Sequence, residues 1–167
     1  MSLRNQLELQ LRNLQAASAA MPTRVQVTDP SGIELRLELS QLDSMSCGFL
    51  ELALFLPQLQ NSTFQTLKQW GQDLSQRVSY LLENIGIQEL DSGNGQILIR
   101  STPPQGSPAG TQYYEVLLSS TGNGTFVLRR FRSISGQPGR VPVEMQVTYE
   151  VLFKLVDDLI ATSPSVP

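Results

Sequence analysis

The side chains that most often perform catalysis are scarce in this chain. Its 167 residues include no histidine and one cysteine, Cys47. Without histidine there can be no Ser-His-Asp or Cys-His catalytic group and no imidazole metal site, and one cysteine cannot form an internal disulfide or a multi-cysteine zinc site. Cys47 lies in an apolar stretch without a basic neighbour, so we expect a buried, unreactive thiol. The composition favours a non-enzymatic protein that needs no cofactor and no metal.

The densest group of positive charges is the segment 129–132, Arg-Arg-Phe-Arg. The guanidinium group of arginine can bind phosphate or carboxylate through two hydrogen bonds. In a strand, alternation would place Arg130 and Arg132 on one face and the other two residues on the opposite face. We name Arg100, Arg130 and Arg132 as candidate contacts for an anionic small ligand or nucleic acid. The alternative is a solvated strand whose arginines pair with acids such as Glu115.

Acid pairs and glycine-rich segments indicate little further chemistry. Asp157 and Asp158 would diverge on a helix, and Glu34 and Glu38 would share the wet face of a strand, so we expect ordinary surface charge from all four. The segment 91–95, Asp-Ser-Gly-Asn-Gly, begins like a calcium loop but lacks glutamate at position twelve, and we interpret it as a turn. A histidine-free active site assembled from distant residues stays open as a third hypothesis; its sign would be a deep pocket with convergent side chains.

A helix and a hairpin open the chain. Leucines at intervals of three and four residues predict a helix over about residues 2–20 with one apolar stripe. The stripe consists of Leu3, Leu7, Leu11 and Leu14. It could cover the chain's own sheet or contact a partner, and we name it as the candidate protein interface. From residue 24 the apolar period changes to two, and residues 25–39 predict a β-hairpin that turns at Asp29-Pro30-Ser31-Gly32.

A third strand and a long helix are expected next. Residues 47–56 are apolar on both faces, which predicts a central or covered strand. One face of this strand would carry Leu50, Leu52, Leu54 and Leu56. Ser62 and Gln65 match a capping box, and apolar residues at helical spacing then predict a helix that continues to Ile85 and stops at Gly86.

The C-terminal half predicts further strands and a last helix. Extended segments are expected at 87–90, 96–101, 113–119, 125–132 and 141–147. Residues 102–111, with three prolines and two glycines, would form a surface loop or a strand connection. Asn123-Gly124 suits the turn of a second hairpin, and Thr148 would cap the final helix.

Together these elements predict an α+β fold. We expect a predominantly antiparallel sheet of about six or seven strands packed by three helices, in the order α-βββ-α-ββββ-α. The elements would form a single domain over residues 1–162, with a frayed tail at 163–167. In size, acidity and element order the chain is similar to the chaperones that escort type III secretion effectors. That resemblance covers element order only, and such an analogy assigns no function.

Charge and hydropathy limit the possible partners. Twelve Lys+Arg against fifteen Asp+Glu give a net charge of −3, which argues against nucleic acid. The longest apolar run, 47–57, is interrupted by Glu51 and is too short to cross a membrane. The N-terminus lacks a signal-peptide pattern, so we expect a cytoplasmic protein. Our leading hypothesis is a protein-binding module, a small adaptor, assembly factor or chaperone-like homodimer, that acts through an apolar helix face or a strand edge.

Overall fold

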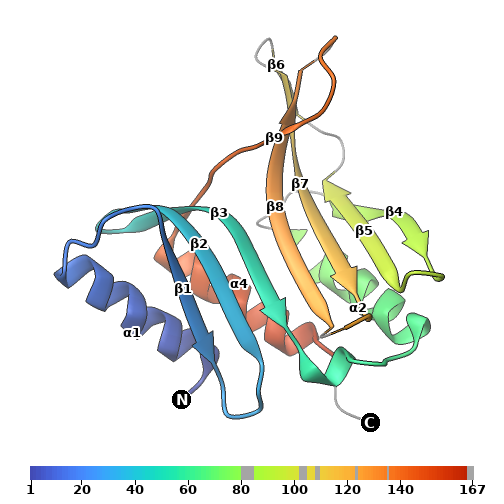
Figure 1. Cartoon of the computed structure of the whole chain (residues 1–167), viewed down its shortest axis with the longest axis horizontal. Coiled ribbons are helices and arrows are strands. Elements are labelled where there is room, and N and C mark those ends of the chain that lie inside the picture. Colours follow the sequence, from blue (N-terminus) through green and yellow to red (C-terminus); the bar gives the residue numbers. More distant parts are fainter. Residues whose placement is uncertain (80–84, 102–104, 108–109, 123, 135, 165–167) are drawn as a thin grey trace.

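The chain forms one antiparallel sheet with helices packed against it (Figure 1). The computed structural model describes residues 1–79, 85–101, 105–107, 110–122, 124–134 and 136–164. In these ranges the helices are α1 (Leu3–Ala16), η1 (Pro57–Leu59, a 3-10 turn), α2 (Phe64–Arg77) and α4 (Tyr149–Thr162). The strands are β1 (Thr23–Thr28), β2 (Glu34–Leu42), β3 (Ser46–Phe55), β4 (Ile85–Asp91), β5 (Gln96–Ser101), β6 (Gln105–Ser107), β7 (Gly110–Ser119), β8 (Thr125–Ser133), β9 (Val141–Pro142) and β10 (Met145–Thr148). The predicted α+β class and element order are confirmed.

The strand order departs most from the chain order between β3 and β8, and β5 and β7 are also neighbours without β6 between them. The main path of the sheet is β1-β2-β3-β8-β7-β5-β4, so β8 from the second hairpin lies beside β3. Three short strands are attached to this path, because β6 pairs with β7, β9 with β8 and β10 with β3. The main path agrees with the prediction of six or seven strands. The short strands lie in the segments 102–111 and 141–147, where loops or a single extended segment were expected.

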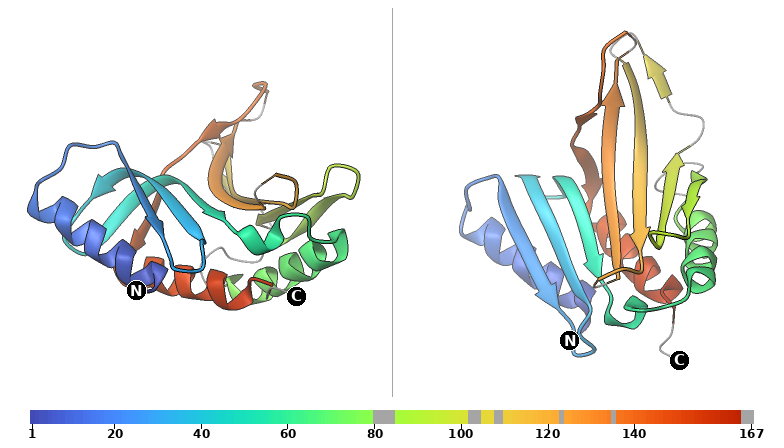
Figure 2. Two further views of the ribbon diagram at one scale, coloured as in Figure 1. Left: turned by 60° about the horizontal axis from the view of Figure 1, so that its bottom comes forward. Right: turned by 45° about the vertical axis from the view of Figure 1, so that its right-hand side comes forward.

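All three long helices lie on one side of the sheet (Figure 2). Alternation along β2 sends Leu35, Leu37 and Leu39 to the helix side, where they are buried, and leaves polar residues on the other side. Trp70 of α2 packs against Phe126 of β8 with ring centroids 6.0 Å apart. We call the side of the sheet opposite the helices the open face, since no described helix covers it.

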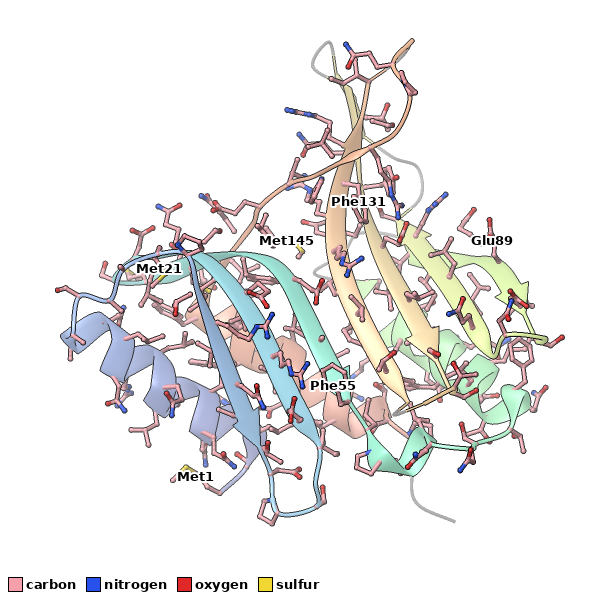
Figure 3. All side chains as sticks on the ribbon, in the orientation of Figure 1. Met1, Met21, Phe55, Glu89, Phe131 and Met145 are labelled. Atoms are coloured by element: carbon pink, nitrogen blue, oxygen red, sulfur yellow. The ribbon has the colours of Figure 1, made fainter. Side chains whose placement is uncertain are left out.

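The sheet divides into two branches at its centre. β3 and β8 pair directly only between residues 51–55 and 125–129. Beyond that point β10 takes the place beside β3 and β9 takes the place beside β8. Figure 3 shows Met145, the first residue of β10, between the two branches. The segment that passes from β9 to β10 therefore connects the branches.

Two predicted boundaries were wrong. α2 ends at Arg77, and β4 begins at Ile85, which was expected at the end of that helix. Ile85 fits a helical period with Val78 and a strand period with Ile87 equally well, so spacing alone could not assign it. The predicted helix residue Leu81 lies outside the described residues. At the start of α2 the capping side chain is Thr63, which accepts from the Thr66 N–H at 3.2 Å, rather than Ser62.

One strand face was also predicted wrongly. The pairing of β2 with β3 passes from Glu38↔Glu51 to Leu39↔Phe49, so Leu50 is an extra residue in a bulge. Leu50 is 41% exposed, while Phe49 takes the core position with Leu52. Because this strand is apolar on both faces, its sequence shows no alternation of polar and apolar residues, and the bulge could not be predicted from it.

Candidate functional site

A row of charged residues crosses the open face from strand to strand. The registers of the sheet place one residue from each of six neighbouring strands opposite the next. In order along the sheet they are Arg100, Glu115, Arg129, Glu51, Glu38 and Arg24. We call this set the charge row. In β3, β5, β7 and β8, the residue that belongs to the row points to the side of the sheet opposite the core residues of the same strand.

Most charges in the row are neutralised by a neighbour. Arg129 Nε donates to Glu51 Oε2 at 2.7 Å, and Arg24 Nε donates to Glu38 Oε1 at 2.5 Å. These pairs are largely exposed, so each contributes little to stability, roughly 0–1 kcal/mol. The pairs fix the directions of the side chains and leave the face nearly neutral.

Glu115 is the second residue of the row, between Arg100 and Arg129, and its most buried member. Only 8% of Glu115 is exposed. Its carboxylate accepts from Arg100 Nε at 3.2 Å and from both terminal nitrogens of Arg140, one of them at 3.1 Å. The hydrogen bonds to Glu115 are the main reason that the pKa of the Arg140 guanidinium is raised above its ordinary value. Glu115 thus holds the segment before β9 against the open face.

Aromatic rings complete the surroundings of Arg140. Its guanidinium lies 3.8 Å from the ring centroid of Phe131 and donates to the Tyr113 hydroxyl at 3.3 Å. Arg100 lies 5.3 Å from the Tyr113 ring centroid. Sequence reasoning named Glu115 only as a neutralising acid and gave no role to Tyr113 or to the ring of Phe131. A usable signal was that Glu51, Arg100 and Glu115 are isolated charges within otherwise apolar strands.

An apolar band lies beside the charge row on the same face. Two residues away from the charge row on each of four strands lie Leu98, Leu117, Val127 and Ala53, which are opposite one another. The first three are partly exposed and Ala53 is buried. We call these four residues the apolar band. The charge row flanks the band on one side, and Gln96, Ser119, Thr125 and Phe55 flank it on the other, so the face has a mixed apolar and charged character.

A shallow pocket of about 390 Å³ opens at one end of the open face. It is lined by Gly32, Glu34, Arg36, Phe55, Pro57 and Gln60. Arg36 lies 4.3 Å from the Phe55 ring centroid and donates to Glu34 at 2.5 Å, so the two charges of the pocket neutralise each other. Phe55 and Phe131, both labelled in Figure 3, lie on β3 and β8. The pocket extends the face with an aromatic ring and a guanidinium.

The structure does not bring the three predicted anion contacts together. Arg100 belongs to the charge row on the open face. Arg130 and Arg132 lie on the opposite side of β8, as alternation predicted, where their register partners are Tyr114 and Gln112. The separation of Arg129 from Arg130 and Arg132 follows the sequence prediction.

The predicted interface on α1 is part of the chain's own core. Leu3, Leu7 and Leu11 are almost completely buried, and Leu14 is partly buried against the same core. The stripe covers β1 and β2 because a sheet with one apolar side needs such a layer. This corrects the expectation for the three buried leucines, which present no surface to a partner.

The two outer strands of the main path are protected edges. β1 has α1 packed along it, and Gln6 of α1 donates to the Thr28 carbonyl at 2.9 Å. β4 carries a register shift between Ile87 and Glu89, and its last residues are exposed and include two acids. Bulges and charges of this kind hinder pairing with another strand. The open face is therefore a better contact surface than either edge.

Cys47 and the acid pairs have structural surroundings. Cys47 is buried, as predicted, and burial together with Asp43 and Glu144 raises the pKa of its thiol to about 12. Glu34 and Glu38 form the expected surface pairs. Asp158 corrects the expectation of surface charge: it is 4% exposed and accepts from Arg77 at 3.0 Å, which joins α4 to α2.

The glycine-rich segment 91–95 is a turn. The Asp91 carboxylate accepts from the Asn94 amide side chain at 2.8 Å and from its backbone N–H at 3.1 Å, and these bonds lower the pKa of Asp91. Among the described residues, no group of three or more histidine, cysteine, aspartate or glutamate side chains could hold a metal ion. No helix in the described part of the chain is long and apolar enough to span a membrane.

Comparison with known proteins found no family model, no curated protein and no solved structure that matches this chain.

Proposed function

We propose that this chain is a protein-binding module whose contact surface is the open face of its sheet, and that the partner is a different protein. The observation that supports this most is the asymmetry of the sheet. Three helices bury one side, while the other side presents the apolar band, the charge row and the pocket around Phe55. Partly exposed apolar residues within a ring of hydrogen-bonding groups are characteristic of protein interfaces.

The charge of the face favours a protein over a polyanion. The open face and the adjoining segment before β9 carry five arginines and four glutamates that pair with one another. They are Arg24, Arg36, Arg100, Arg129, Arg140, Glu34, Glu38, Glu51 and Glu115. A nucleic acid or an anionic membrane would be attracted by a large excess of positive charge, whereas these nine residues have a net charge of only +1. A protein surface with charges of both signs around an apolar centre fits it better.

The order of the charges disfavours a second copy as the partner. When two identical faces meet about a two-fold axis with their charge rows aligned, the two rows run either in the same order or in the opposite order. In the first case each charge faces its own copy. In the reversed case Arg100 faces Arg24 and Glu115 faces Glu38, and only Arg129 faces an opposite charge, that of Glu51. Like charges at an interface cost free energy, so we expect a partner with its own sequence rather than a homodimer through this face.

A charge-swap variant tests the proposal without breaking the sheet. Arg129→Glu combined with Glu51→Arg preserves the ion pair between β8 and β3 but reverses its direction on the face. Arg4→Glu combined with Asp157→Arg makes the same swap between α1 and α4, on the helix side, and is the matched control. Both variants should keep the wild-type thermal midpoint within about 2 °C, since exposed pairs contribute little.

The variants are compared by affinity capture with the tagged full chain in its native host. We expect the wild type and the helix-side control to retain one partner in a fixed ratio, and the open-face swap to lose it by at least tenfold. Equal recovery by all three chains would contradict the proposal. Recovery of a second copy of the chain alone, with the same dependence on the swap, would replace the partner by a homodimer and would also contradict it.

A further inference from the structure

Two arginines differ from all the others in this chain. Of ten arginines, eight form an ion pair with a carboxylate. The paired ones are Arg4, Arg12, Arg24, Arg36, Arg77, Arg100, Arg129 and Arg140. Arg130 and Arg132 have no acidic partner among the described residues, although both are only partly exposed.

Arg130 and Arg132 are neighbouring residues on one side of β8. They are two residues apart along the strand, which sets their Cα atoms about 7 Å from each other. The Nε atom of each is buried and has no hydrogen-bond partner in the described part of the structure. The guanidinium of Arg130 lies 5.1 Å from the ring centroid of Tyr114, and Gln112 is the register partner of Arg132. The site is on the opposite side of the sheet from the open face.

The side chain of Arg132 packs against a glycine on the neighbouring strand. Gly110 of β7 has φ +119°, and a Cβ there would lie 3.1 Å from the Cγ of Arg132 and 2.6 Å from the Ser133 carbonyl. Glycine at this position therefore leaves room for the stem of Arg132 beside the strand. With its stem packed, the side chain loses less conformational freedom when its charged end binds a ligand.

Two adjacent cations with buried, unsatisfied donors are costly in a folded protein unless an anion compensates them. We propose that Arg130 and Arg132 bind one phosphate group of a small molecule, with Gln112 and Tyr114 beside it. Guanidinium groups match the oxygens of phosphate in charge and in hydrogen-bond geometry. The chain has a net charge of −3 and the site has two arginines without an acidic partner among the described residues, so a small phosphate compound fits it and a polynucleotide does not.

Titration of the full chain with inorganic phosphate, followed by backbone amide chemical shifts, tests the site. We expect saturable shifts centred on residues of β7 and β8, and competition by sulfate. Arg130→Gln and Arg132→Gln should each weaken binding by roughly tenfold or more. Arg12→Gln removes an exposed, paired arginine from α1 and should leave the affinity unchanged. Pyrophosphate is the second probe: tighter binding than inorganic phosphate would indicate a longer phosphorylated ligand, and equal binding a single free phosphate.

A thermal measurement keeps the test valid if a variant folds differently. Phosphate should raise the melting temperature of the wild type and of Arg12→Gln but not that of the Arg130→Gln, Arg132→Gln double variant. Without phosphate the double variant should melt no lower than the wild type, because it loses unpaired charges. Absence of saturable phosphate binding by the wild type, or binding that survives the double substitution, would overturn the proposal. The open-face partner should bind all these variants equally, so failure here and failure of the proposed function are distinguishable.

Discussion

Replacement of Glu115 by glutamine perturbs the most buried residue of the charge row with almost no change in shape. The carboxylate of Glu115 accepts from Arg100 and from both terminal nitrogens of Arg140. Glutamine keeps one acceptor oxygen, but its amide nitrogen is a donor and would face a guanidinium donor. The variant therefore loses the negative charge and at least one hydrogen bond, and it leaves two arginines without their partner.

The size of the effect follows from the burial of the pair. Removing one partner of a fully buried ion pair costs about 3–5 kcal/mol. The side chain of Glu115 is 10% exposed, but those of Arg100 and Arg140 are 39% and 37% exposed, so solvent screens part of the loss. We expect Glu115→Gln to lower the free energy of unfolding by about 1–3 kcal/mol. For a chain of this length that corresponds to a melting temperature roughly 3–10 °C lower.

Urea and thermal denaturation followed by far-ultraviolet circular dichroism measure this loss. The matched control is Glu8→Gln, which removes a partly exposed acid paired with the exposed Arg12 on α1 and should change the stability by less than about 0.5 kcal/mol. Arg140→Gln in the Glu115→Gln background should cost little more, because the partner is already gone. If Glu115→Gln unfolds within about 0.5 kcal/mol of the wild type, Glu115 does not hold the segment before β9, and the reasoning is refuted.

Three further predictions concern the core, a helix terminus and the buried thiol. Leu7→Ala should lower the free energy of unfolding by about 2–5 kcal/mol, because Leu7 is fully buried on the inner side of α1. Leu9 is exposed, so Leu9→Ala should change the free energy of unfolding by less than about 0.5 kcal/mol. Equal effects would contradict the assignment of the stripe to the core. Thr148→Ala should lower the stability by about 1 kcal/mol, since the Thr148 hydroxyl accepts the Val151 N–H at 3.2 Å, while Thr148→Ser should preserve it. The pKa of Cys47 is raised from 9.0 to about 12, so between these pH values the unfolded chain loses the proton and the native chain keeps it. In that pH range the stability of the wild type should therefore fall relative to that of Cys47→Ala, by up to about 1.4 kcal/mol per pH unit. A stability difference between the two that does not change with pH would show that the thiol is not buried.

Local patterns determined which parts of the fold were predictable. The period-two segments became β1, β2, β5, β7 and β8, and Thr148 caps α4 as expected. The end of α2 was missed because Ile85 fits a helical period with Val78 and a strand period with Ile87. The bulge at Leu50 was missed because it depends on the pairing of β2 with β3, which no residue of β3 specifies alone.

The open face was not predictable, for a related physical reason. Its charge row exists only because β8 lies beside β3 and β7 lies between β8 and β5, and these pairings join residues far apart in the sequence. Sequence analysis could separate Arg129 from Arg130 by alternation within one strand. It could not show that Glu51 lies opposite Arg129, or that Arg140 returns to Glu115 after a loop.

Site-specific photo-crosslinking in the native host tests the central claim most directly. A photoreactive amino acid replaces Val127, a partly exposed member of the apolar band, and in a parallel chain it replaces the exposed Leu9 on the outer side of α1. The account predicts one adduct with a different polypeptide from position 127, its loss when Arg129 and Glu51 are swapped, and no such adduct from position 9. An adduct of the same mass from both positions, or an adduct from position 127 that survives the swap, would contradict it.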